Sequence, residues 1–148
     1  AKGVDAIRSE LVPHARLVTP NAPEAEVLTG KAVETVDGQR RAAEQLLELG
    51  ANGALVKGGH IPGSKIVDVL QTTTGEWIFE SPRIDTTSTH GTGCTLASAI
   101  AALLGQGASV PDAVEQGRDY LMGAIHAAKG FGRGDGPVHH GWVLDEDD

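Results

Sequence analysis

A glycine-rich turn in the second half of the sequence has the composition of an anion-binding site. Gly91 and Gly93 flank Thr92, and Cys94 follows just before an apolar stretch that predicts a helix over 96–104. The first amides of a helix lack acceptors within the helix, and the helix dipole adds partial positive charge there. Glycines let such a backbone close around an anion, so the turn could hold the charge that develops on a transferred phosphoryl group. A plain glycine turn with a polar cap is the structural alternative.

Cys94 is the only cysteine of the chain and stands at the start of this expected helix. A helix N-terminus favours the thiolate, which could accept a proton from a substrate hydroxyl group. A free cysteine is more commonly a small buried hydrophobic residue, and the sequence leaves both interpretations open. A single cysteine also excludes an internal disulfide, and we expect a cytoplasmic protein.

An amide and a carboxylate, Asn21 and Glu24, follow a short apolar stretch at 16–19 that predicts a strand. Ligands of α/β proteins bind at the carboxyl ends of strands. The two side chains could therefore organise a hydrated Mg²⁺ ion, which keeps several of its waters. The alternative is a helix cap, with Asn21 as N-cap, Pro23 in the first turn and Glu24 at the third helical position.

Lys57 ends a second buried stretch, 54–56, which also predicts a strand and is stopped by Gly58 and Gly59. A lysine at the carboxyl end of a strand can reach a phosphate group as a point charge. A surface lysine beside a turn is the alternative interpretation.

The elements that must position these residues alternate between helices and buried strands along the 148 residues. This alternation predicts an α/β fold in one domain, with a central, mostly parallel β-sheet flanked by helices on both faces and a short β-hairpin. The expected elements are a helix end at 5–11, strands at 16–19 and 54–56, a helix at 39–49, a hairpin of 66–71 and 76–80, a helix at 96–104 that is buried on nearly all sides, and a helix at 110–128 that Ser109 caps and Gly130 ends.

The charge balance excludes one class of partner. The formal net charge is −8, from 12 Lys and Arg against 20 Asp and Glu, whereas a general nucleic-acid surface needs clustered cations. A small phosphate site can still be built from amides and one or two lysines. The longest apolar stretch, 96–104, is too short to span a bilayer, and the acidic residues 145–148 are expected to form a solvated tail. We therefore expect neither a nucleic-acid partner nor a membrane.

Four stretches of the sequence occur together in the order typical of one family. They are 17–26, 56–60, 90–102 and 136–140, and on them the chain resembles the hydroxymethylpyrimidine/phosphomethylpyrimidine kinases of thiamine biosynthesis, members of the ribokinase-like superfamily. The resemblance covers nearly the whole chain. It implies a partial ribokinase-like fold and ATP-dependent phosphorylation of 4-amino-5-hydroxymethyl-2-methylpyrimidine, of its monophosphate, or of both. A pyridoxal or pyridoxine kinase is the alternative enzyme, and a catalytically silent nucleotide-binding fragment is the alternative of another class.

The resemblance also implies ATP and Mg²⁺ as cofactors and assigns roles to the residues of the site. The implied roles are Mg²⁺ held through water by Asn21 and Glu24, contact with the ATP phosphates by Lys57, and an anion hole formed by Gly91, Thr92 and Gly93. Most members of the superfamily have an aspartate as general base where this chain has Cys94. The pyrimidine kinases share the cysteine, so the resemblance implies that Cys94 acts as the base or positions the substrate.

Members of that family are longer than this chain. The chain therefore looks like the carboxyl-terminal part of a ribokinase-like kinase domain whose amino-terminal part is missing. The resemblance implies that the residues that recognise the pyrimidine lie mainly in the missing part. The resemblance thus implies a small pyrimidine substrate and ATP as partners, with a homodimer or an association with the amino-terminal part as further expectations.

Overall fold

The computed structural model describes residues 2–86, 88–131 and 133–147. Three residues of the segments singled out in the sequence lie outside this part: Thr87 before the glycine turn, Gly132 near the end and Asp148 of the acidic tail. The chain divides into two compact units, Ala1–Arg83 and Ile84–Asp148. The single-domain expectation stays a prediction.

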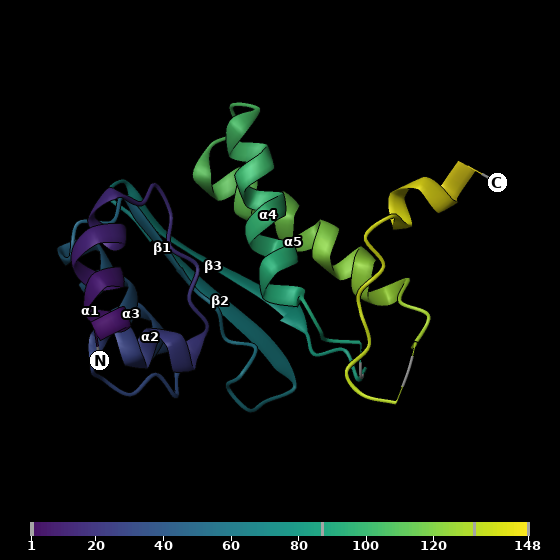
Figure 1. The fold of residues 1–148 in the computed structure, drawn as a ribbon, viewed down its shortest axis with the longest axis horizontal. Coiled ribbons are helices and arrows are strands. Elements are labelled where there is room, and N and C mark those ends of the chain that lie inside the picture. Colours follow the sequence, from purple (N-terminus) through teal and green to yellow (C-terminus); the bar gives the residue numbers. More distant parts are fainter. Residues whose placement is uncertain (1, 87, 132, 148) are drawn as a thin grey trace. The chain divides into compact units, whose positions relative to one another are not determined.

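The first unit combines helices with a three-stranded sheet, and the second consists mainly of two helices (Figure 1). The elements of the first unit are α1 (Lys2–Ala6), the π-helix η1 (Ile7–Leu11), the 3-10 helix η2 (Val12–His14), α2 (Ala22–Thr29), α3 (Val36–Glu48), β1 (Gly53–Val56), β2 (Lys65–Thr72) and β3 (Gly75–Pro82). The elements of the second unit are α4 (Thr92–Gly105), α5 (Val110–His126) and the 3-10 helix η3 (Trp142–Asp147).

The sheet differs from the expected, mostly parallel one. Its order is β1-β2-β3, and both pairings are antiparallel. Thr72 pairs with Gly75, which confirms the predicted hairpin and leaves a two-residue turn that requires antiparallel strands. Parallel pairing in the described part of the first unit is confined to two isolated bridges, Val18 with Ala54 and Asn21 with Lys57.

The connections of the chain explain these directions. The extended segment around Val18 returns to β1 through α2 and α3, and a crossover of this kind permits parallel pairing. A short loop joins β1 to β2, so these two strands run in opposite directions. The expected strand at 16–19 is therefore an extended segment that touches β1 only through bridges.

Helix α3 packs against β1 and β2, and α2 packs against α3 on the same side of the sheet (Figure 1). The packing gives the first unit a core of small and branched side chains, as its low aromatic fraction of 3% requires. The fully buried members of this core are Val12, Ala22, Ala25, Val33, Ala42, Ala43, Leu46, Ala51, Ala54 and Val56.

In the second unit, α4 and α5 form a helical hairpin that packs closely because Gly117 has no side chain. A Cβ at Gly117 would lie 2.9 Å from Ile100 Cγ1. The expectation that α4 is buried on nearly all sides is wrong, since Ala101 and Ala102 are exposed. Alanines tolerate contact with water, so an apolar stretch of this composition need not be buried on every side.

Helix α5 begins as the sequence predicts and ends earlier. The Ser109 hydroxyl accepts a hydrogen bond from the Asp112 amide at 3.3 Å. The helix ends at His126, and Gly130, with a φ of 66°, lies beyond the C-cap Ala127. Among the described residues, no helix is both long and apolar enough to cross a membrane.

Candidate phosphate-binding site

Asn21 and Lys57 lie side by side at the carboxyl ends of two parallel segments of the first unit. The Lys57 amide donates to the Pro20 carbonyl at 2.9 Å, and the Leu55 amide donates to the Val18 carbonyl at 2.8 Å. These bonds align the segment that leads to Asn21 with β1, which leads to Lys57. The strand-end positions expected for the two residues thus follow from backbone pairing.

A buried carboxylate fixes the turn after Lys57. The Gly58 amide donates to Asp68 Oδ1 at 2.9 Å, and Asp68 is 6% exposed. A Cβ at Gly58 would lie 2.1 Å from the Val67 carbonyl oxygen, so only glycine fits between β1 and β2 here. A buried carboxylate needs such donors to offset its desolvation. Lys57 itself is half-buried at the end of this fixed strand.

Gln39, on α3, holds the end of β1 by a hydrogen bond. Its Nε2 donates to the Val56 carbonyl at 2.9 Å and to the Val67 carbonyl at 2.8 Å, and the side chain is fully buried. Neither Gln39 nor Asp68 was singled out in the sequence. A signal existed for Asp68, which interrupts the apolar residues 66–70 in the middle of the strand.

The loop beyond Lys57 is held by a single guanidinium group. Arg83 donates to the carbonyls of Gly59, Ile61 and Gly63, at 2.8, 2.6 and 2.8 Å. Two side chains therefore hold the loop from β1 to β2. Asp68 accepts from the Gly58 amide at its start, and Arg83 donates to carbonyls further along it.

Asn21 and Glu24 form a complete capping box at the start of α2. The Glu24 amide donates to Asn21 Oδ1 at 2.8 Å, and the Asn21 amide donates to Glu24 Oε2 at 2.8 Å. Pro23 occupies the first turn, and Gly30 closes the helix in a left-handed conformation with a φ of 74°. The capping interpretation of these residues is confirmed.

The capping box limits what this pair can offer a metal ion. Asn21 Oδ1 and Glu24 Oε2 are engaged with amides, and Glu24 Oε1 has no hydrogen bond within the described part of the chain. Glu24 is exposed, and no cluster of three or more His, Cys, Asp or Glu able to hold a metal is found among the described residues. One free carboxylate oxygen fits an ion that keeps most of its waters, as Mg²⁺ does.

The glycine turn opens α4 without a side-chain cap. Gly91 is the N-cap, with a φ of 82°, and no side chain of the described residues makes a capping hydrogen bond there. The Thr95 amide and hydroxyl both donate to the Gly91 carbonyl at 2.8 Å, and the Thr92 amide donates weakly to the Thr89 carbonyl at 3.4 Å. In the described part of the chain, the amides of Gly93 and Cys94 have no acceptor. Two adjacent amides at a helix N-terminus are thus left for an external anion.

The last of the four stretches noted in the sequence packs beside this turn. The His90 amide donates to the Gly136 carbonyl at 3.1 Å, and His90 forms an isolated parallel bridge with Pro137. A Cβ at Gly136 would lie 3.1 Å from Ser88 Oγ, and Ser88 is 2% exposed. Backbone from the end of the chain therefore supports the turn, while Cys94 remains exposed at the helix start.

The candidate residues form two groups. Asn21, Glu24 and Lys57 come together in the first unit, and the turn of Gly91 to Cys94 lies in the second. That the two groups serve one ligand stays a prediction.

Comparison with known proteins assigns the chain to a family. Residues 1–139 match the family model described as phosphomethylpyrimidine kinase. Over 146 residues the chain is 45% identical to the hydroxymethylpyrimidine/phosphomethylpyrimidine kinase of Streptomyces coelicolor, a match that covers 99% of this chain and 54% of that protein. The chain thus spans about half the length of the curated relatives it matches.

Two solved structures extend the comparison to the fold. A Bacillus subtilis pyridoxal kinase in complex with ADP is 34% identical, with a TM-score of 0.90 over 97% of this chain and 54% of that one. A phosphomethylpyrimidine kinase from Clostridium difficile is 36% identical, with a TM-score of 0.69 over 82% of this chain and 48% of that one. The fold is thus a partial ribokinase-like α/β fold, and the chain belongs to the phosphomethylpyrimidine kinase family.

Proposed function

We propose that this chain supplies the phosphate-binding part of a hydroxymethylpyrimidine/phosphomethylpyrimidine kinase. The reaction is transfer of the γ-phosphoryl group of ATP to the hydroxymethyl group of 4-amino-5-hydroxymethyl-2-methylpyrimidine, to the phosphate of its monophosphate, or to both in turn. The observation that carries the proposal is the open start of α4, where the amides of Gly93 and Cys94 have no acceptor among the described residues.

The two amides suit the charge changes of this reaction. As the substrate oxygen attacks the γ-phosphorus and the bond to the ADP oxygen breaks, negative charge spreads over the phosphoryl oxygens. Donors already aimed at that position stabilise the charge without reorganising. Lys57, held at the end of β1, adds a positive charge for the ATP phosphates.

Cys94 receives the proton in this mechanism. Cys94 is exposed in the first turn of α4. The hydroxyl proton of the pyrimidine passes to Sγ as the new O–P bond forms. The chain then releases ADP and the phosphorylated pyrimidine.

A hydrated Mg²⁺ ion would be held beside α2 through its own water ligands. Glu24 Oε1 is the free carboxylate oxygen, and Asn21 orients Glu24 through the capping box. When bound with ATP, the ion would neutralise phosphate charge. Glu24 would hold the ion through water, which suits the preference of Mg²⁺ for retaining its hydration shell.

A pyridoxal kinase is the second candidate, favoured by the structural likeness to the Bacillus subtilis pyridoxal kinase at 34% identity. The two candidates share phosphoryl-transfer chemistry and differ in the alcohol. An assay of ATP consumption with each alcohol separates them. The enzyme for the assay is this chain, alone and co-expressed with the half of the Streptomyces coelicolor relative that it does not match.

The decisive variant is Cys94→Ala, with Ser98→Ala as its control on an exposed position of the same helix. We expect pyrimidine-dependent turnover to fall by about 10²–10⁴-fold in Cys94→Ala and to stay unchanged in Ser98→Ala. Equal turnover in both variants would exclude Cys94 as the base. Binding of ATP with Mg²⁺ in a calorimeter, without turnover of either alcohol in any form of the protein, would instead support a silent nucleotide-binding fragment.

A further inference from the structure

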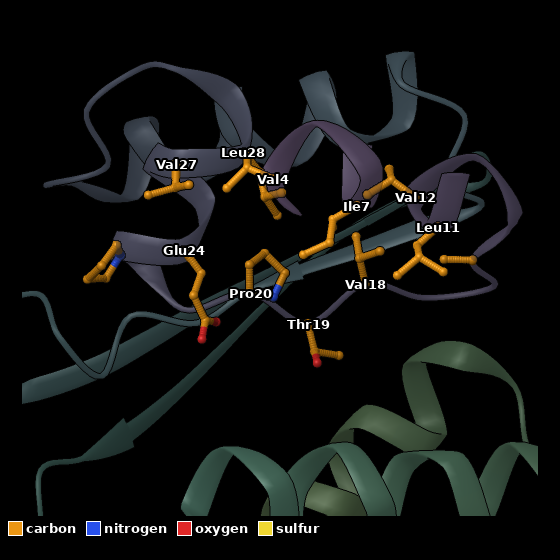
Figure 2. A pocket seen from close by; sticks show the side chains of 12 residues that line it. Val4, Ile7, Leu11, Val12, Val18, Thr19, Pro20, Glu24, Val27 and Leu28 are labelled. Carbon is orange, nitrogen blue, oxygen red and sulfur yellow. The ribbon is translucent and has the colours of Figure 1, made fainter. Parts of the chain in front are cut away.

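Two hollows of the chain meet apolar side chains in different ways. The pocket on α1, η1 and α2 leaves Ile7, Leu11 and Val27 exposed along its lining (Figure 2). The notch on α5 at Gly123 is filled, because a Cβ there would overlap the indole ring of Trp142. Glycine is a poor residue for the interior of a helix, and its presence there is explained by a packing partner of this kind.

Several contacts hold the indole ring of Trp142 on α5. Its Nε1 donates to the Tyr120 carbonyl at 3.1 Å, and the centres of the two rings lie 6.2 Å apart at an interplanar angle of 40°. The Tyr120 hydroxyl donates in turn to the His140 carbonyl at 2.6 Å. A tryptophan whose ring is packed and whose N–H is bonded fixes the segment that carries it.

The residues on either side of the indole are docked on α5 or on one another. The His139 amide donates to the Ala124 carbonyl at 2.9 Å, and Val138 is 4% exposed. The His139 Nε2 lies 2.7 Å from Asp145 Oδ2, which closes the segment on itself. Residues 138–145 are named the docked segment below.

The docked segment begins beside the glycine turn. The two residues before it, Gly136 and Pro137, pair with His90 through the bond from the His90 amide to the Gly136 carbonyl at 3.1 Å and through the isolated parallel bridge. His90 directly precedes Gly91, the N-cap of α4, where no side chain of the described residues makes a capping hydrogen bond. Backbone pairing at 136–137 is therefore the support that the structure gives this turn.

The loop on the other side of residues 136–137 gives no comparable support. Residues 129–131 and 133–135 are exposed, and no backbone hydrogen bond joins them to the rest of the described chain. Gly130 and Gly134 add backbone freedom to this loop. The position of residues 136–137 thus depends on the docked segment that follows them.

We propose that Trp142 is a positioning residue for the turn of Gly91 to Cys94. It acts through the docked segment and the pairing of residues 136–137 with His90. The matched family model ends at residue 139, so the proposal concerns a side chain outside the matched part. That the turn binds phosphate rests on the proposed function, whereas the holding of the turn by Trp142 does not.

Hydrogen exchange of the full chain tests whether the turn is held in this way. Trp142→Ala should speed exchange of the His90 amide by at least about tenfold, because its acceptor on Gly136 is no longer fixed. The Ala113 amide, which donates to the Ser109 carbonyl at the far end of α5, should exchange as before.

Two further variants calibrate this effect. Leu144→Ala is the matched control, since Leu144 is 77% exposed on the same short helix η3 and should leave the exchange of the His90 amide unchanged. Trp142→Phe keeps a ring for the notch and loses the bond to the Tyr120 carbonyl, so it should fall between Trp142→Ala and the unsubstituted chain.

Gly123→Ala separates docking of the indole from stability of the helix. Alanine favours a helix over glycine, but its Cβ takes the place of the indole ring. We expect this variant to speed exchange of the His90 amide as much as Trp142→Ala does. The double variant should add nothing to either single one, because both remove the same contact.

Affinity for AMP-PCP with Mg²⁺ supplies the functional readout, on this chain co-expressed with the half of the Streptomyces coelicolor relative that it does not match. Trp142→Ala and Gly123→Ala should each weaken binding by at least about tenfold, because the competent turn is less populated, while Leu144→Ala changes it by less than about twofold. Unchanged exchange of the His90 amide in both variants, or faster exchange with unaltered affinity, would overturn the proposal. Faster exchange in a protein whose unsubstituted form binds no AMP-PCP would support the holding of the turn and count against the proposed function alone.

Discussion

Helices α2 and α4 both begin beside residues expected to handle phosphate, and they begin in opposite ways. The first turn of α2 is closed by its own side chains, with Asn21 and Glu24 each accepting from the other's amide at 2.8 Å. The first turn of α4 has Gly91 as its cap and leaves the amides of Gly93 and Cys94 unpaired among the described residues. Among the described residues, the start of α4 therefore leaves two adjacent backbone donors, whereas the capping box of α2 occupies the amides of Asn21 and Glu24.

The same contrast holds for the loops around the two helices. In the first unit, buried polar side chains fix the strand end at Lys57, with Asp68 on the Gly58 amide and Gln39 on the Val56 carbonyl. In the second unit, backbone pairs such as His90 with Gly136 support the turn from behind. The chain thus holds the strand end at Lys57 by a polar network and leaves the start of α4 without a side-chain cap.

We expect the largest loss of stability from a substitution at Gly58, where the hydrogen bond to Asp68 holds the end of β1. Gly58→Ala should lower the free energy of unfolding by about 3 kcal/mol, because the added Cβ would lie 2.1 Å from the Val67 carbonyl oxygen. Chemical denaturation measures the change. Gly59→Ala is the control, since nothing lies within 4 Å of a Cβ at that position. Equal unfolding free energies of the two variants would contradict the claim that buried polar side chains hold the end of β1 rigidly.

A smaller effect is expected at the closed start of α2. Asn21→Ala removes the acceptor of the Glu24 amide and should cost about 1 kcal/mol of unfolding free energy. Glu24→Gln keeps a carbonyl oxygen for the Asn21 amide and should cost less. Denaturation of both variants checks the order. If Asn21→Ala left stability unchanged and abolished Mg²⁺-dependent nucleotide binding, Asn21 would be a ligand and not a cap.

The sequence predicts features that depend on neighbouring residues. The hairpin between β2 and β3 and the Ser109 cap of α5 are confirmed because each is decided within a few residues. The open turn at Gly91 follows in the same way from glycine at a position with a φ of 82°.

Features that depend on distant segments could not be predicted. The direction of a strand depends on how the chain returns to the sheet, and the antiparallel pairing of β1 with β2 therefore contradicts the expected parallel sheet. Gln39 reaches the Val67 carbonyl across 28 positions of sequence, and no local pattern indicates that partner. Burial of a polar side chain becomes interpretable only when the groups around it are known.

The central claim is that the uncapped start of α4 binds the transferred phosphate, and amide chemical shifts test it most directly. The measurement is a titration with AMP-PCP and Mg²⁺ of the isotope-labelled chain, co-expressed with the half of the Streptomyces coelicolor relative that it does not match. The account predicts that the amide signals of Gly93 and Cys94 shift most among those of α4, and that both shift more than the Glu24 amide, which already donates to Asn21. Saturation with nucleotide that leaves Gly93 and Cys94 unmoved, or that shifts the first turn of α2 instead, would contradict it.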